Sequence, residues 1–443
     1  MSKFRFPCTT GLTVILLSGV FWVRAVIAQE QPVAFVGARV IPIEGREFSD
    51  GVVIVHKGLI VALGPRNEVE ISESTAAIDA TGRVIMPGLI CTHSHIGDIE
   101  GADGASPIQP EIRILDSINV RDSGFRRAVA GGLTTLNIMP GSGHLISGQT
   151  VYVKLRPANR IEQRYIRDDQ GRPLGGLKMA NGTNSRGTPP FPGSRAKSAA
   201  LVREQYVRAQ EYREKRARNP EDEKNRPPRN LGMEALVEVL EKRRIVHHHT
   251  HRHDDIITVL RLAKEFDFRV VLHHVSEGWK VADEIAEAGM ACSVILVDSP
   301  GGKLEAIDLS FKTPAVLEQA GVLTAFHTDD WITDSRIFLR MAAMGVRGGM
   351  TREGALQGVT LAGATMLDLD KRIGSLVVGK DADFVILDGD PLSVYTKVLE
   401  TWVEGTKVFD RSIPEDRLYA VGGYGAGSDR PRYRCCINEE ERR

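Results

Sequence analysis

The stretch VIMPGLICTHSHIG, residues 84–97, places two histidines at the end of an apolar strand. The apolar run breaks at Pro87 and Gly88, resumes, and delivers His93 and His95 one residue apart. Alternate side chains of a strand point to the same face, so both imidazoles can reach one metal ion. Zinc and similar divalent ions readily take imidazole nitrogen as a ligand. The stretch therefore predicts a metal site at a strand end.

The distribution of the other histidines supports this prediction. Eleven of the twelve histidines lie between His93 and His327, and seven of these lie between His247 and His274. An isolated HxH pattern is usually a chance pair in a loop. Clustering of this density disfavours that interpretation.

The composition is that of an ordinary globular protein. The chain has 443 residues, with 42% apolar and 26% charged residues, enough for one large core and a smaller unit. Lys+Arg and Asp+Glu both number 57, and aromatic residues make up 6%. Neither a basic charge nor a base-stacking surface is present, so no nucleic-acid partner is expected.

The N-terminus has the pattern of a secretory signal peptide. Lys3 and Arg5 precede an apolar stretch over 11–23, and VIA at 26–28 is followed by Gln29. We expect cleavage near Gln29, export to the periplasm or the medium, and no stable membrane span afterwards. The stretch is shorter than the roughly 20 residues of a spanning helix, although an uncleaved anchor is the alternative.

Short strands are predicted at both ends of the chain, over 32–86 and again over 374–410, separated by Gly, Asp and Ser. They predict a small β-sandwich domain built from both chain ends. The middle alternates strands with helices in eight steps, which predicts a (β/α)8 TIM barrel with its site at the carboxyl ends of the strands. Its third strand is predicted at 151–155 and its fourth at 176–180.

The predicted organisation follows from these patterns. A charged insertion is expected at 182–230, with a basic helix that presents a solvated face or forms a lid over the barrel mouth. Cys435 and Cys436 lie in a polar C-terminal tail, and no disulfide framework is implied. The predicted parts are a signal peptide at 1–28, a composite β-sandwich domain at 29–86 with 371–410, a barrel at 87–370, and a tail at 411–443.

Several motifs in order along the chain resemble the amidohydrolase superfamily, nearest its imidazolonepropionase-like and prolidase-like members. They are PGLICTHSH, GLTTLNIMPGSG, HTHRHDD, LHHVSEG, HTDD and IGSLVVGKDADFVILDGDP. The resemblance runs from about residue 32 to 410. It implies a barrel that holds one or two divalent metal ions, with two ions and zinc as our expectation; manganese and iron suit the same ligands.

The resemblance assigns metal ligands residue by residue. It makes His93 and His95 ligands of a first metal, and His249 and His274 ligands of a second. Asp329 would bind the first metal and serve as general base. The family often places a carboxylated lysine between the metals. By strand count we expect Lys178 in that role, with Lys154 as the competing candidate.

The resemblance leaves weaker expectations for other residues. His144, His251 and Arg252 lie on loops at the predicted mouth and are candidates for substrate contact. His247 is expected to pack deeper than His249, and His248, His253 and His273 are expected to be structural or surface groups. Asp330 should point away from Asp329. Where the family usually has an acid two residues before the first histidine, this chain has Cys91.

The predicted activity is metal-dependent hydrolysis of an amide-type C–N bond in a dipeptide, an N-acyl amino acid or a cyclic amide. A mononuclear deaminase is the alternative, although strand five lacks the HxxE glutamate of deaminases. A non-catalytic exported binding protein is the second alternative. The expected partner is a small-molecule or peptide substrate, and the sequence leaves open whether the chain forms a homo-oligomer.

Overall fold

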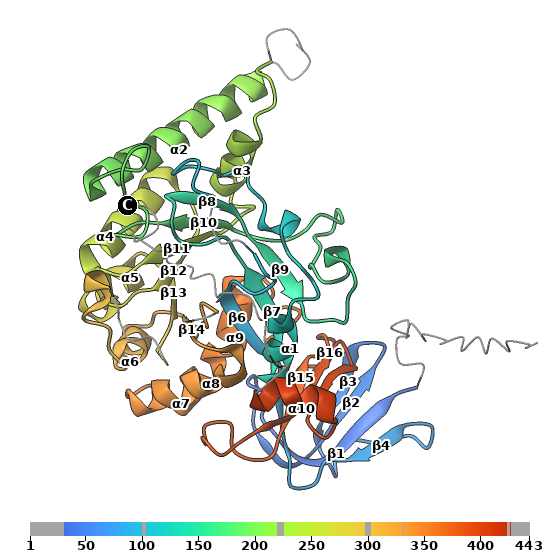
Figure 1. The fold of residues 1–443 in the computed structure, drawn as a ribbon. Helices are drawn as coiled ribbons and strands as arrows, with labels where there is room; N and C mark the ends of the chain where they lie inside the picture. Colours follow the sequence, from blue (N-terminus) through green and yellow to red (C-terminus); the bar gives the residue numbers. More distant parts are fainter. Residues whose placement is uncertain are drawn as a thin grey trace, which may run out of the picture.

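The computed structural model describes residues 31–99, 103–218, 226–296, 303–330, 332–422 and 426. It is a mixed α/β fold, as predicted, in which helices flank the central strands and a β unit lies at one end (Figure 1). The predicted signal peptide at 1–28 and the cysteines Cys435 and Cys436 lie outside the described residues. Among those that are described, no helix is both long and apolar enough to cross a membrane.

Strands from the two ends of the chain pair in one eight-stranded sheet. Its order is β17-β16-β15-β5-β1-β2-β3, with β4 paired to β1. The bounds are β1 Val33–Val40, β2 Phe48–His56, β3 Leu59–Pro65, β4 Ala76–Asp79, β5 Val84–Pro87, β15 Phe384–Leu387, β16 Val398–Val403 and β17 Thr406–Asp410. The two ends meet where β5 runs antiparallel to β15.

The core of this β unit draws on both chain ends. The rings of Phe35 and Phe384 lie edge to face at 5.0 Å, and Trp402 stacks on Phe384 at 5.5 Å. All three side chains are buried in one apolar cluster. Because β1 supplies one ring and β15 and β16 the others, neither chain end can complete this core alone.

The middle of the chain forms a six-stranded and a three-stranded sheet, with orders β14-β13-β12-β11-β10-β8 and β6-β7-β9. Their bounds are β6 Leu89–Ser94, β7 Leu133–Ile138, β8 Ile146–Gln149, β9 Val151–Lys154, β10 Leu177–Ala180, β11 Val246–Thr250, β12 Val270–His274, β13 Ala291–Val294 and β14 Thr324–Phe326. The strands β10 to β14 are mutually parallel, and β6 is parallel to β7. Apart from Gln149 and Ala291, every residue of these strands is buried, as parallel sheets covered on both faces require.

The expectation of eight parallel strands is wrong at the third strand. Residues 151–154 do form a strand, but β9 runs antiparallel to β7, and the preceding β8 runs antiparallel to β10. A parallel crossover needs about a dozen or more residues, usually including a helix. Only the short loop 139–145 separates β7 from β8, so the chain turns straight back.

The helices are α1 Ser123–Ala130, α2 Arg195–Arg218, α3 Leu231–Leu240, α4 His253–Phe266, α5 Ala282–Glu287, α6 Thr313–Gln319, α7 Arg340–Arg347, α8 Arg352–Gly358, α9 Leu361–Met366 and α10 Pro414–Val421. The long helix α2 is the predicted helix of the insertion and extends along one flank of the molecule (Figure 1). Its buried residues are Ser198, Val202, Tyr206 and Ala209, which share one face at helical spacing. Tyr206 stacks on Phe266 of α4 at 5.2 Å. The charged residues of α2 form i,i+4 ion pairs on its exposed side, as the solvated-face interpretation predicts.

Candidate metal centre

His93, on β6, and His95, just after it, meet the carboxylate of Asp329, which follows β14. His93 Nε2 lies 3.0 Å from His95 Nε2, and Asp329 Oδ1 lies 3.2 Å from the first and 3.0 Å from the second. All three side chains are buried. His95 Nδ1 contacts the backbone oxygen of Met139 at 2.8 Å, and that bond turns Nε2 of the ring toward Asp329. These three predicted residues therefore converge on one point.

Of the two candidate lysines, the structure brings Lys178 to this point. Lys178 lies within β10 and is fully buried, with Nζ 2.9 Å from His93 Nε2 and 3.0 Å from Met139 Sδ. Lys154 lies opposite Thr135, near the start of β7. There its Nζ pairs with Asp383 and lies 2.8 Å from Asp381 Oδ2. The reversed strand direction thus puts Lys154 at the other end of the central strands.

A second group of ring nitrogens lies beside the first. One nitrogen each from His249, His251 and His274 lies within 4.8 Å of the others, and so do ligand atoms of His93, His274 and Asp329. His274 is common to both groups. It belongs to β12, whereas His249 and His251 come from β11 and the turn after it. The structure therefore adds His251, which the sequence placed only at the substrate mouth, to the possible ligands.

Two of these residues adopt left-handed backbone conformations. The φ angles are +71° for His274 and +49° for Asp329, a region that non-glycine residues rarely occupy. Adjacent residues on a regular strand face opposite sides. The left-handed conformation of His274 lets its side chain reach the same site as that of His273. Strain of this kind is concentrated at functional sites.

Burial shifts the pKa values of the histidines and of Asp329 at this site. It lowers the pKa of His93, His249, His251 and His274 well below the ordinary histidine value, and Lys178 lowers the pKa of three of these further. Burial alone would raise the pKa of Asp329, but the hydrogen bond from His95 and nearby positive charge bring it below its usual range. His93, His249, His251 and His274 are therefore neutral and Asp329 is ionised, which are the states in which these groups bind a divalent cation.

Several buried histidine nitrogens have no hydrogen-bond partner within the described ranges of the chain, which suits them to bind a metal ion. Among the described residues, no hydrogen-bond partner reaches either ring nitrogen of His249, Nε2 of His251 or Nε2 of His274, and all four atoms are buried. Buried polar atoms are ordinarily satisfied, because an unmade bond is costly. The donor set of imidazole nitrogens and carboxylate oxygens suits zinc, manganese or iron.

Cys91 and Asp330 support the ends of β6 and β14. Cys91 Sγ lies 3.2 Å from the backbone oxygen of His93 and 3.3 Å from Thr328 Oγ1. Asp330 accepts hydrogen bonds from the hydroxyls of Ser94, at 2.6 Å, and Thr328, at 2.8 Å. The carboxylate of Asp330 thus faces away from the histidines, as predicted, and the thiol links the two strand ends where the family usually has an acid.

The two other substrate candidates are His144 and Arg252. His144 is buried, with its ring 5.4 Å from that of Phe191. Arg252 is partly exposed and pairs with Asp254 at 2.9 Å. His248 points to the opposite side of β11, where it lines a cavity of about 320 Å³ between α2 and α4. The period of two along a strand separates it from His247 and His249.

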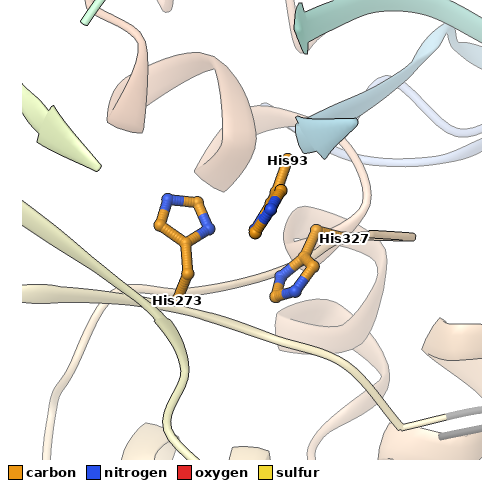
Figure 2. A group of neighbouring side chains, drawn as sticks. All are labelled: His93, His273 and His327. Carbon is orange, nitrogen blue, oxygen red and sulfur yellow. The ribbon is translucent and has the colours of Figure 1, made fainter. Parts of the chain in front are cut away.

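Two histidines without a predicted role in the site lie inside it. Figure 2 shows His93, His273 and His327 pointing toward one another, and a nitrogen of each lies within 4.8 Å of the others. The rings of His93 and His327 are stacked at 4.8 Å, and His273 meets His93 edge to face at 5.0 Å. We expected His273 to be a structural or a surface group; it is fully buried, which excludes the surface alternative. His327 directly follows the buried strand β14 and lies two residues before Asp329, so the period of two could have found it.

Comparison with known proteins gives the class of this chain. Residues 228–409 match the amidohydrolase family model. An amidohydrolase of Thermotoga maritima MSB8 of known structure is 32% identical, with a TM-score of 0.80 over 86% of this chain and 100% of that one. The chain belongs to the amidohydrolase superfamily.

Two further relatives extend this result. The amidohydrolase tasK of Hapsidospora irregularis is 25% identical over 84% of this chain, which spans only 41% of the length of tasK. A putative prolidase from Bifidobacterium longum has the same fold, with 16% identity and a TM-score of 0.55 over 85% of this chain and 94% of that one. The resemblance to the amidohydrolase superfamily that the motifs predicted is confirmed.

Proposed function

We propose that this protein is a metal-dependent hydrolase that cleaves an amide-type C–N bond in a dipeptide, an N-acyl amino acid or a cyclic amide. The observation that carries the proposal is the convergence of His93, His95 and Asp329 within 3.2 Å of one another, with Lys178 and His274 beside them. Few arrangements of buried side chains other than a metal centre account for so many imidazoles around one carboxylate.

Two divalent ions, with zinc as our expectation, would be held by His93, His95 and Asp329 on one side and by His249 and His274 on the other. Lys178 would be carboxylated and lie between them. Ions bound there would lower the pKa of water toward neutrality and polarise the substrate carbonyl. His251 is a further candidate ligand for the second ion, because its Nε2 is buried beside His249 and His274.

Asp329 is the proposed general base and acid. Its carboxylate is ionised and buried, so it can take the proton of the attacking water and return it to the leaving nitrogen. His95 holds the carboxylate in place through the 3.0 Å contact between its Nε2 and Oδ1. The net reaction adds water across the C–N bond and yields a carboxylic acid and an amine.

The deaminase alternative lacks its acid in the centre. The nearest candidate by sequence is Glu277, in the HVSE segment. Its carboxylate contacts His253 Nδ1 at 2.6 Å and Lys280 Nζ at 3.0 Å instead. Those partners lie outside the histidine cluster, and they disfavour a role for Glu277 in proton transfer at the site.

We further propose that the two central sheets are a distorted form of the predicted (β/α)8 barrel. Two contacts between their outer edges support closure. The backbone N–H of Asp329, after β14, donates to the oxygen of His93 on β6 at 3.1 Å, and Thr92 Oγ1 lies 2.7 Å from Ser293 Oγ on β13. The predicted domain boundaries and export after cleavage near Gln29 are part of the same proposal.

The test is a substrate screen coupled to metal analysis. Protein beginning at Gln29 would be loaded with zinc or manganese and assayed against libraries of dipeptides, N-acyl amino acids and cyclic amides. We expect close to two ions per chain and release of an amine from one of these classes. Release of ammonia from aminated heterocycles alone would favour a deaminase, and stoichiometric metal with no turnover would favour the binding protein.

A further inference from the structure

A chain of hydrogen bonds leads from Tyr152 on β9 through His247 to His273 in the histidine cluster. The hydroxyl of Tyr152, on β9, lies 3.0 Å from His247 Nε2, and His247 Nδ1 lies 3.0 Å from His273 Nε2. The remaining nitrogen of His273, Nδ1, is buried without a hydrogen-bond partner among the described residues. All three side chains are buried. The chain therefore ends on one unsatisfied nitrogen inside the centre.

The direction of these bonds follows from the surroundings of Tyr152. Its ring packs in an apolar cluster with Ile90, Ile166 and Leu367. In the part of the chain that the structure describes, His247 Nε2 is the acceptor within reach of the hydroxyl. Burial raises the pKa of Tyr152, so the phenol keeps its proton and needs an acceptor. The hydroxyl must then donate to Nε2.

Each neutral imidazole has one N–H and one lone pair. If Nε2 of His247 accepts, its Nδ1 carries the proton and donates to His273 Nε2. Because Nε2 of His273 accepts this bond, the proton of its own ring is on Nδ1. That atom therefore presents an N–H to the cluster, and it has no lone pair to offer a metal.

The sheet keeps the ring of His247 in this position. A side chain at Gly176 would come within 2.2 Å of His247 Cδ2 and 2.5 Å of the backbone oxygen of Ile245. Only glycine lets the imidazole lie this close to the strand. The ring is thus confined between Gly176 on one side and its partners Tyr152 and His273 at its two nitrogens.

We propose that His273 is a fixed hydrogen-bond donor of the centre and no metal ligand, and that Tyr152 and His247 are the positioning residues that set it. The proposal rests on the proposed metal-dependent hydrolase. The acceptor is an anionic oxygen near His93, supplied by a carboxyl group on Lys178 or by the substrate. His273 meets His93 edge to face at 5.0 Å, and in Figure 2 one of its ring nitrogens lies on the side facing His93.

The tautomer can be measured without metal or substrate. In the metal-free protein labelled with ¹⁵N-histidine, the His273 signals, assigned by their loss in His273→Gln, should show a proton on Nδ1 and a bare Nε2. Tyr152→Phe should mix the two tautomers of His273. Tyr206→Phe is the matched control, since its buried hydroxyl contacts Met179 Sδ and no histidine. A proton on Nε2 of His273 in the wild type would overturn the proposal.

Metal content separates a donor from a ligand. His273→Ala and His273→Asn should keep the zinc stoichiometry of the wild type, whereas His274→Ala should lose zinc. Loss of zinc in His273→Ala equal to that in His274→Ala would show His273 to be a ligand and overturn the proposal. A wild type that binds no zinc would instead defeat the proposed function, and the metal-free tautomer would still decide the hydrogen-bond chain.

Turnover and carboxylation identify the acceptor. Loss of one preorganised donor to a developing oxyanion typically costs about 10²–10³-fold in kcat, so His273→Ala should lose at least about tenfold and His273→Asn, which restores an N–H near Nδ1, less. Unchanged turnover in His273→Ala would contradict the proposal. If ¹³C-bicarbonate labels Lys178 in the wild type and the carbamate signal falls in His273→Ala, the acceptor is the carboxylated lysine. If the signal is unchanged while kcat falls, the acceptor is the substrate.

Discussion

Two lysines among the described residues are fully buried, and they lie at opposite ends of the central strands. Lys154 has carboxylates around it: Asp383 pairs with its Nζ, Asp381 lies 2.8 Å away and Glu404 4.0 Å away. Lys178 has a ring nitrogen of His93 at 2.9 Å and the sulfur of Met139 at 3.0 Å. The same residue type is thus buried in an anionic setting at one end and among imidazoles at the other.

This difference is the reason why we propose a structural role for Lys154 and a role in metal binding for Lys178. At Lys154 carboxylates offset the charge of the ammonium. Asp381, Asp383 and Glu404 come from the C-terminal part of the chain, so the ion pairs tie the β unit to β9. At Lys178 an ammonium faces neutral rings that would themselves accept a cation. Carboxylation would remove that positive charge and supply oxygens to the same place, which is why we propose it for Lys178 alone.

The largest effect expected is that of Lys178→Ala. Loss of the bridging group should abolish metal retention and activity, with the fold intact by circular dichroism. Formate or acetate should restore part of the activity, because a short carboxylate can occupy the place of the carbamate. Metal analysis and turnover with and without the added acid are the measurements. Retention of two ions by Lys178→Ala would break the contrast between the two lysines.

Asp329→Asn tests the carboxylate that lies beside His93 and His95. Asparagine keeps the shape and one oxygen ligand but cannot take a proton, and general-base contributions are typically about 10²–10⁴-fold. We expect a loss of that size in kcat at matched metal content.

Asp330→Asn is the control for that variant. Its carboxylate accepts bonds from Ser94, Thr328 and Ser335, so the change should lower stability by about 1–3 kcal/mol and turnover far less than Asp329→Asn. Equal losses of kcat in the two variants would exclude the role assigned to Asp329.

Lys154→Met should act on stability and leave the metal content unchanged. Removing one partner of a buried ion pair costs about 3–5 kcal/mol, because the remaining charge stays buried. Urea denaturation measures this change in the free energy of unfolding. Loss of bound metal from Lys154→Met, with Lys178→Ala unaffected, would reverse our assignment of the two lysines.

The stability of Lys154→Met should also depend on pH. Burial already raises the pKa of Asp383, and the charge of Lys154 counteracts that rise. Without Lys154 the folded-state pKa rises further, so the folded protein binds more protons than the unfolded chain above about pH 4, the ordinary range of an aspartate. The deficit relative to wild type should therefore shrink as the pH falls from 7 toward 5, and a deficit that grows would contradict this account.

The smallest effect is expected from Arg372→Ala, at the exposed side of the carboxylates around Lys154. Arg372 Nη2 lies 2.9 Å from Asp381 Oδ2, but its side chain is 45% exposed. Solvent and salt screen such a pair, so Arg372→Ala should cost less than about 1 kcal/mol of unfolding free energy. The effect should shrink in high salt. A loss as large as that of Lys154→Met would mean that exposure does not distinguish the two cations.

The sequence by itself determined the strands and helices of the centre, the family, and most of the residues that meet there. An apolar run with period two, ended by His93 and His95, contains this information locally, and so do the runs before His249 and Asp329. Only the tertiary structure decided the direction of residues 151–154, and with it which lysine lies among the histidines. A short apolar run forms a strand in either direction, and its pairing depends on hydrogen bonds to segments far away in the sequence. The place of His273 was also undecided, because adjacent residues on a regular strand face opposite sides. His274 joins it in the centre through a left-handed backbone conformation that only the surrounding packing imposes.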